Sequence, residues 1–311
     1  MRYTIGTILH NGRATPVIGV RDLFWELAEL DSALFVLGNP KLIQLFDDWD
    51  KSEARLSALA ERLSEESTEK AIFPQPAKES FLTPLQFPAK VLLMGANYYD
   101  HVRGDAGWVD FEKSDKVPTL FFKPPTTTLV GSGKSVRYPT QSTKFDWEIE
   151  LAAIISKKGK RISVESALDY VAAYTIGLDL SARDWQFDPK HIVKWDLFGG
   201  KGFDDSCPLG PTLTPARFVD HKNLQLQLRL NGELKQNANT RDMIWTLAEQ
   251  ISAMSEHVTL EPGDVIMTGT PAGVGLKSGT FMKVGDRLDA EISDLGCLSV
   301  EIIEDNPAKE A

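Results

Sequence analysis

The segment KFDWEIELAAII, residues 144–155, decides how this chain is interpreted. Its apolar end, residues 151–155, predicts a strand that enters a core. Glu148 and Glu150 stand two residues apart at the start of this strand, and side chains at that spacing point to the same face. Their β-carbons would lie about 7 Å apart, so the two carboxylates would repel one another unless a positive group lies between them.

Spacing alone leaves two interpretations of this pair open. A Glu-x-Glu pattern on a strand is most often a solvated face. Here both flanks of the pair are apolar, and Trp147, Ile149 and Leu151 fill the opposite face, which indicates a central strand. Unpaired acids are costly at such a position. The setting therefore strengthens the case for a bound cation, with the solvated face as the alternative.

A third acid follows in YTIGLDLSARDWQ, where Asp179 ends an apolar strand and precedes a turn. Three carboxylates at strand ends, with no His or Cys cluster nearby, are typical of a site for a hard cation. Oxygen ligands select Mg²⁺, Mn²⁺ or Ca²⁺ over zinc or copper. Three acids do not fill an octahedral shell, so water or substrate oxygens would complete it. Such an open site can carry out chemistry.

The composition limits the class of protein. The chain has 311 residues, of which 42% are hydrophobic and 25% charged, as in ordinary globular proteins. Its formal net charge of −10 argues against a nucleic-acid partner, which requires a basic face. No apolar run approaches the roughly 18 residues of a membrane span, and the N-terminal residues lack the apolar segment of a signal peptide. The two cysteines, Cys207 and Cys297, suit a cytoplasmic protein without a disulfide framework.

The chain is expected to divide into a small N-terminal domain, residues 1–88, and a larger domain, residues 89–311. Prolines at positions 74, 76, 84 and 88 interrupt regular structure between the two parts and mark the boundary. The N-terminal part predicts an α/β arrangement with a hairpin that turns at Asn11–Gly12, followed by helices over residues 21–30 and 42–63.

The larger part is rich in short apolar strands. A second hairpin is expected at Asn231–Gly232, and residues 241–258 break the run of strands with a helical pattern. Strands and helices do not alternate regularly, which indicates an α+β fold rather than a βαβ chain.

Several segments of this larger part resemble the fumarylacetoacetate hydrolase family. In order, between residues 91 and 303, they read NYYDHVR, LFFKPPTTTLVG, DWEIEL, LDLSARDWQ, GGKGFDDSCPLGP, LNGELKQ, MIW and GDVIMTGTPAGVG. Each piece is weak alone, but the set in this order is specific. The resemblance implies mixed β-sheets rolled into a barrel-like sandwich, and a homodimer formed through the β-rich domain.

The resemblance also implies a metal site and two catalytic residues. Glu148, Glu150 and Asp179 match the acids that hold a divalent cation in this family, usually Mg²⁺ and in some members Mn²⁺ or Ca²⁺. His101, in NYYDHVR, matches a histidine that activates water, and Lys201, in GGKGFD, matches a lysine that reaches the substrate's oxygens. The ordinary alternatives are a surface histidine on a polar loop and an exposed loop lysine.

Three further residues match positions that contact substrate in the family: Arg183 and Gln186, in LDLSARDWQ, and Thr270, in TGTPAGVG. An equally plain interpretation of Arg183 pairs it with Asp184 or another carboxylate. Lys123, in FFKPP, is either a loop lysine or a support behind the ligands.

One position departs from the family pattern. Many shorter members have a glutamate three residues after the histidine, where it pairs with the imidazole in a mobile lid. Here that position is Gly104. Asp105, Asp110 or Glu112 substitutes for it, or the histidine works without a partner. Residues 100–116 are polar, contain two glycines and are expected to form a lid over the substrate.

The expected activity is metal-dependent hydrolysis of a C–C bond in a 2,4-diketo acid, such as an acylpyruvate, a fumarylpyruvate or a diketo-deoxy sugar acid. The alternatives are decarboxylation of oxaloacetate or keto–enol isomerisation at the same site. A protein that binds such acids without catalysis is the third hypothesis, and Gly104 is its sole support.

Overall fold

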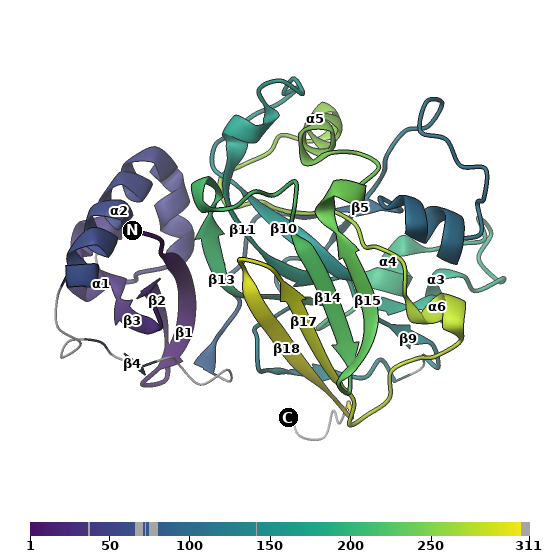
Figure 1. Ribbon diagram of the computed structural model, residues 1–311. Helices are drawn as coiled ribbons and strands as arrows, with labels where there is room; N and C mark the ends of the chain where they lie inside the picture. The colour runs from purple at the N-terminus through teal and green to yellow at the C-terminus, as the bar shows by residue number, and fades with distance from the viewer. Residues whose placement is uncertain (37, 66–70, 72, 75–79, 141, 306–311) are drawn as a thin grey trace.

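The structure is a computed structural model that describes residues 1–36, 38–65, 71, 73–74, 80–140 and 142–305 (Figure 1). Its architecture is mixed α+β with β-sheets at the centre, which confirms the predicted fold class. The strands pair in open orders, and no closed barrel forms within the described part of the chain. None of the helices in those ranges is long and apolar enough to cross a membrane.

An 11-stranded sheet forms the centre of the molecule. Its order is β4-β3-β2-β1-β13-β11-β10-β16-β5-β6, and β7 pairs with β13. The strands are β1 (Thr4–His10), β2 (Arg13–Val20), β3 (Leu23–Glu26), β4 (Phe73–Pro74), β5 (Val91–Gly95), β6 (Thr119–Lys123), β7 (Leu129–Val130), β10 (Ile149–Ile155), β11 (Val171–Leu178), β13 (Cys207–Pro215) and β16 (Val265–Met267). Most neighbours are antiparallel, whereas β16 with β5 and β13 with β7 are parallel.

Two smaller sheets complete the β structure. The five-stranded one has the order β15-β14-β17-β18-β8 and the other pairs β12 with β9. Their strands are β8 (Ser135–Arg137), β9 (Phe145–Asp146), β12 (Ser181–Ala182), β14 (Gln225–Leu230), β15 (Glu233–Asn239), β17 (Arg287–Ile292) and β18 (Gly296–Ile303). The helices are α1 (Leu27–Leu30), α2 (Trp49–Glu65), α3 (Arg183–Gln186), α4 (Leu197–Lys201), α5 (Leu247–His257) and α6 (Gly275–Ser278).

Strand β10 is central, and its side chains supply two hydrophobic cores. All seven of its residues are buried. Leu151, Ala153 and Ile155 pack in the core shared with β14, β17 and β18, whereas Ala152 and Ile154 belong to the core shared with β1, β2 and α2. Alternate residues of a strand face opposite sides of its sheet. The continuous apolar run 151–155 is therefore explained by burial on both faces.

Both predicted hairpins form, because Asn and Gly tolerate the positive φ that their turns require. The φ angles are 48° and 75° at Asn11 and Gly12, and 51° and 83° at Asn231 and Gly232. The helix predicted over residues 21–30 is wrong in its first half, since residues 23–26 pair with β2 as strand β3. The helical pattern from residue 42 begins as a 3-10 segment (Leu42–Asp48) that continues into α2.

The N-terminal elements lie beside β13, to the left in Figure 1. Strand β1 pairs with β13 at Ile5 and Leu213, so the large sheet runs from one part of the chain into the other. The division at residues 88 and 89 stays a prediction. Of the prolines that suggested it, Pro76 lies outside the described residues.

Candidate metal centre

The three predicted metal ligands lie together at the ends of β10 and β11. Asp179 directly follows β11, and its backbone N–H donates to the carbonyl of Glu148 at 2.9 Å, which fixes the two strand ends against each other. Glu148, Glu150 and Asp179 each offer one carboxylate oxygen, and these oxygens lie within 4.8 Å of one another. All three side chains are buried. The structure thus brings Asp179 next to two glutamates that precede it on another strand.

The donor set fits a hard divalent cation. In the described chain, Glu150 accepts one hydrogen bond, from the Gly269 amide at 2.8 Å. Oδ1 of Asp179 lies 2.8 Å from Nζ of Lys123, but in a direction that makes no hydrogen bond. Buried carboxylate oxygens with so few donors are costly without a positive charge between them. All-oxygen ligands favour Mg²⁺, Mn²⁺ or Ca²⁺.

Glu148 and Glu150 differ in their electrostatic surroundings. Burial raises the pKa of Glu148, but the charges of Lys201 and Arg183 outweigh burial and lower the pKa to about 2. Burial, with the charges of Asp179 and Glu148, instead raises the pKa of Glu150 well above its ordinary value. Glu150 therefore needs a bound cation more than Glu148 does.

Lys201 reaches the site from the end of α4, a short helix that Asp196 caps by accepting from the Gly199 amide at 3.0 Å. Nζ of Lys201 donates to Oε2 of Glu148 at 3.1 Å and also contacts Oδ2 of Asp179. Its side chain is buried. The structure therefore brings the predicted catalytic lysine to the acids, not to solvent.

The predicted substrate-binding residues lie at the same site, and two of them are already held by protein groups. Arg183 donates from Nε to Oδ2 of Asp146 at 2.8 Å and from a terminal nitrogen to Oε1 of Glu148 at 2.5 Å. The alternative pairing with a carboxylate thus forms with these two acids and not with Asp184, whose oxygens accept from Ser142 and Thr143.

Gln186 and Thr270 differ in whether their side chains can still bind a ligand. Arg183 donates to Oε1 of Gln186 at 3.2 Å, which orients the amide so that its NH₂ group stays free of partners within the described chain. The hydroxyl of Thr270 donates to the Ile149 carbonyl at 2.8 Å and accepts from Gln236 at 2.9 Å. Gln186 can donate to a ligand, whereas Thr270 supports the backbone of β10.

His101 has a carboxylate partner, and that partner is Asp105. Nδ1 of His101 and Oδ2 of Asp105 are 3.0 Å apart. Residues 101–105 form a single π turn, closed by the bond from the Ala106 amide to the His101 carbonyl at 3.0 Å. Of the other candidates, Glu112 pairs with Arg103, and no contact of the exposed Asp110 carboxylate is found among the described residues.

Lys123 is not a loop lysine. Its side chain is fully buried, and its Nζ donates to the carbonyls of Leu180 and Ser206 and lies beside Asp179. Lys123 is thus placed beside the third predicted metal ligand, inside the protein. Two further residues hold the site together and were not predicted from the sequence. Asp146 accepts from Arg183, and Gln236 donates to Thr270 and accepts from the Ile149 amide at the start of β10. Their one signal was their position inside the segments DWEIEL and LNGELKQ.

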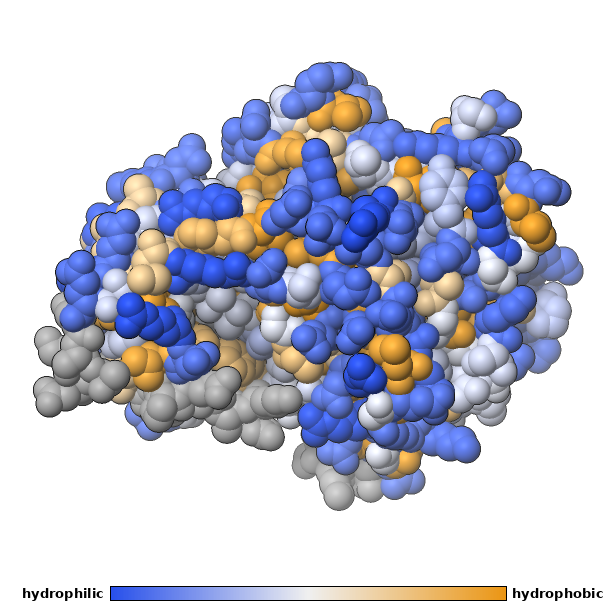
Figure 2. Space-filling view, in the orientation of Figure 1, coloured by the Kyte–Doolittle hydropathy of each residue, from blue (hydrophilic) through white to orange (hydrophobic). Residues whose placement is uncertain are grey.

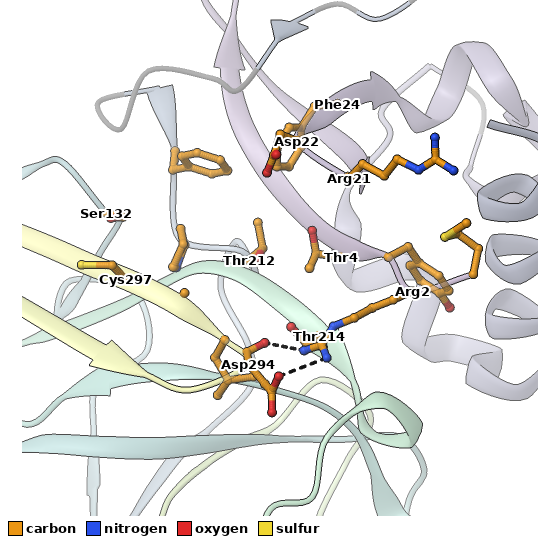
Figure 3. A pocket seen from close by; sticks show the side chains of 17 residues that line it. Arg2, Thr4, Arg21, Asp22, Phe24, Ser132, Thr212, Thr214, Asp294 and Cys297 are labelled. Carbon is orange, nitrogen blue, oxygen red and sulfur yellow. Dashed lines mark hydrogen bonds and ion pairs between the residues drawn. The ribbon is translucent and has the colours of Figure 1, made fainter. Parts of the chain in front are cut away.

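A cavity of about 770 Å³ lies elsewhere, between β1, the turn after β2, β13 and the turn before β18 (Figure 3). Arg2 and Asp294 form an ion pair at its edge. It contains none of the predicted site residues. The residues predicted to carry the chemistry therefore lie at the candidate metal centre and not around this cavity.

Comparisons with known proteins all identify relatives in one family. The model of the fumarylacetoacetate hydrolase C-terminal domain matches residues 90–303. A mitochondrial oxaloacetate tautomerase of Xenopus laevis is 42% identical over 229 residues, which are 72% of this chain and 68% of that protein. A fumarylacetoacetate hydrolase from Exiguobacterium antarcticum superposes with a TM-score of 0.78 at 26% identity, covering 97% of this chain and all 100% of that one.

A second solved structure matches three quarters of the chain. It is a fumarylpyruvate hydrolase from Pseudomonas aeruginosa, in complex with Mn²⁺ and pyruvate. The two proteins are 34% identical with a TM-score of 0.63, over 75% of this chain and 99% of that one.

Proposed function

The chain belongs to the fumarylacetoacetate hydrolase family, and we propose that it is a divalent-metal-dependent tautomerase that interconverts the keto and enol forms of oxaloacetate or a related 2-keto dicarboxylic acid. The observation that carries the proposal is the buried triad of Glu148, Glu150 and Asp179 beside Lys201, in a chain about 40% identical to a named oxaloacetate tautomerase. Hydrolysis was the first expectation from the sequence, but these relatives favour its isomerase alternative.

The reaction needs few groups. A proton leaves carbon 3 of the keto acid and a proton reaches the oxygen on carbon 2, while every C–C bond stays intact and no water is consumed. A divalent cation held by the three acids would withdraw charge from the substrate's oxygens and so make the hydrogens on carbon 3 more acidic.

The protein's own groups would move the proton and stabilise the negative charge that develops on the substrate. Asp105 accepts from Nδ1–H of His101, which leaves Nε2 with a lone pair that can take the proton from carbon 3. The free NH₂ group of Gln186 and the ammonium of Lys201 would donate to the oxygen that gains negative charge. Arg183 holds Glu148 in place instead of binding substrate.

The test follows the enol form of oxaloacetate by its ultraviolet absorbance. We expect the protein with Mg²⁺ or Mn²⁺ to accelerate conversion to the keto form, and exhaustive chelation to remove the acceleration. Glu148→Ala should abolish it, and His101→Ala should reduce it by about 10²- to 10⁴-fold, the usual contribution of a general base. Conversion at the buffer rate in the intact, metal-loaded protein would exclude this function.

Hydrolysis of a 2,4-diketo acid is the second candidate, and two observations favour it. The His101–Asp105 pair could activate water, and a relative named as a hydrolase is 34% identical in sequence. Products distinguish the candidates: hydrolysis yields a carboxylic acid and pyruvate, decarboxylation of oxaloacetate yields pyruvate and CO₂, and tautomerisation yields neither. Binding of these acids with no product and no change in enol absorbance would instead support a non-catalytic protein.

A further inference from the structure

Four consecutive backbone amides, from Gly273 to Leu276, hold two buried carboxylates. The N–H groups of Gly273 and Val274 donate to Oδ2 of Asp105 at 3.0 and 3.5 Å. The next two, of Gly275 and Leu276, donate to Oδ1 and Oδ2 of Asp146 at 2.6 and 2.9 Å. We call these four amides the amide bracket. The first three lie in the segment GTPAGVG and the fourth belongs to Leu276, which directly follows it; the proposed reaction does not otherwise use these amides.

The bracket has little freedom to adopt another shape. Gly273 has φ of 104°, and a β-carbon there would lie 2.1 Å from the carbonyl oxygen of Lys235. A β-carbon on Gly275 would lie 2.1 Å from the carbonyl oxygen of Thr280 and 2.7 Å from Oδ1 of Asp146. The Gly273 carbonyl is also fixed, because it accepts from the indole of Trp147 at 3.1 Å. Neighbouring backbone groups thus determine where the four N–H groups point.

The two carboxylates contact different groups of the candidate site. Asp105 accepts from His101, the proposed base. Asp146 accepts from Nε of Arg183, whose terminal nitrogen donates to the metal ligand Glu148. Both acid side chains are nearly inaccessible to solvent, at 8% for Asp105 and 0% for Asp146. Hydrogen bonds from an amide to a carboxylate are directional, and the shorter of these, to Asp146, are of a strong class in proteins.

We infer that the amide bracket couples the position of His101 to the position of Glu148, with Asp105 and Asp146 acting as positioning residues. Packing of the turn at residues 101–105 then fixes the position of the bracket. The bracket in turn fixes the positions of Asp146, Arg183 and Glu148. The inference rests on the proposed function only for the role of His101. Its structural core, a link between Asp105 and the metal site, holds for any reaction there.

The experiment measures Mn²⁺ binding by calorimetry in Asp105→Asn and in the matched control Asp115→Asn. Both variants remove one acid from residues 100–116, but Asp115 is exposed and lies outside the bracket. Substitutions in the shell around a metal site usually cost 10- to 100-fold in affinity. Asp105 acts on Glu148 only through the bracket, Asp146 and Arg183, so we expect a smaller loss, of about three- to tenfold. Asp115→Asn should bind Mn²⁺ as the unaltered chain does.

Hydrogen exchange of the peptide containing residues 273–276 gives a second measurement in the same variants. Asp105→Asn should accelerate exchange at all four amides, not only at the two that Asp105 accepts from. Equal Mn²⁺ affinity in the two variants, or faster exchange confined to Gly273 and Val274, would overturn the coupling. These measurements use no substrate, so their failure is distinct from failure of the proposed function.

Kinetic constants then distinguish a misplaced His101 from general destabilisation of the fold. In Asp105→Asn, kcat should fall more than tenfold while KM changes by less than about threefold, because the base is misplaced but the substrate's other contacts persist. Asp105→Glu should restore part of kcat, since a carboxylate still reaches His101. Full activity in Asp105→Asn would contradict the positioning role directly.

Discussion

Glu148 and Glu150 lie two residues apart but have different surroundings. Glu148 contacts the buried cations Arg183 and Lys201, whereas the described partner of Glu150 is the Gly269 amide. We expect Glu148→Gln to lower the unfolding free energy of the metal-free protein by about 3 kcal/mol, because it leaves two buried cations poorly paired. Glu150→Gln should leave that free energy unchanged or raise it, since it removes a buried charge that no contacting cation offsets.

Urea unfolding after chelation measures this difference, and the same experiment with Mn²⁺ provides the control. A ligand at 100 times its dissociation constant stabilises the native state by about 2.7 kcal/mol, and both variants should lose most of that gain. If Glu150→Gln destabilises the metal-free protein as much as Glu148→Gln, the two acids do not differ as described.

Asp105 predicts a specific dependence of stability on pH. Burial raises the pKa of Asp105, but hydrogen bonds from His101, Gly273 and Val274 outweigh burial and hold the pKa below its ordinary value. A depressed pKa in the folded state gives stability that is complete above the unfolded value of about 3.9 and is lost as the pH falls through the folded value. The difference in unfolding free energy between the intact chain and Asp105→Asn should therefore be constant above about pH 5 and should shrink below about pH 4.

Urea titrations from neutral to acid pH, within the range where both proteins stay folded, test this expectation. Asp115→Asn is again the control, because its exposed carboxylate should show no such convergence. A gap that widens as the pH falls would mean that the Asp105 carboxylate is not stabilised in its charged form.

At the scale of residues, the sequence predicted the triad but not the partner of His101. The period of two along a strand is enough to place Glu148 and Glu150 on one face. The choice between Asp105, Asp110 and Glu112 depends instead on a π turn. Its hydrogen bonds span five residues, not four, and neither the turn nor its side-chain geometry is recognisable from residue spacing.

At the scale of elements, the sequence predicted the existence of strands better than it predicted which strands pair. The run 151–155 is buried on both faces, and any central position would produce the same pattern. The segment 21–30 has helical spacing, yet residues 23–26 form a strand because β2 offers them an open edge. Such a tertiary partner overrides local propensity and cannot be deduced from the segment itself.

The spacing of the glycines in residues 269–275 did not predict the amide bracket. A substitution at Gly275 tests the role proposed for it. In Gly275→Ala the new β-carbon would meet the backbone carbonyl of Thr280 and the Asp146 carboxylate, which the Gly275 and Leu276 amides hold. We expect the unfolding free energy to fall by about 1–3 kcal/mol, as for other overpacked interiors. Mn²⁺ affinity should fall with it, because Asp146 can no longer orient Arg183.

Gly104→Ala is the matched control for this element. A β-carbon on Gly104 meets nothing within 4 Å, so its effect on stability should stay within about 0.5 kcal/mol. Thermal unfolding and Mn²⁺ titration of the two variants provide the comparison. Equal behaviour of Gly275→Ala and Gly104→Ala would show that the bracket tolerates displacement and does not fix Asp146.

At the scale of the whole molecule, the two predicted parts share a sheet and a core. Figure 2 shows a mostly hydrophilic face over both parts, while the apolar side chains gather inside. Ile5, on β1, and Leu56, on α2, belong to the same core as Ile154, Leu213 and Met267 of the larger part. Sequence composition predicted a boundary at the prolines, but it gave no indication of β1 pairing with β13.

Removal of residues 1–88 therefore has a predictable consequence. It would uncover Ile154, Leu213 and Met267, each of which contributes about 1.5–3 kcal/mol when fully buried. Their combined loss is comparable to the roughly 5–15 kcal/mol that stabilises a typical domain. We expect a chain of residues 89–311 to be largely unfolded or aggregated, and the full chain to unfold in one cooperative transition. Near-ultraviolet circular dichroism during heating, with size-exclusion chromatography of both proteins, tests this. A shorter chain that stays monodisperse and melts within a few degrees of the full protein would show instead that residues 89–311 fold as an independent domain.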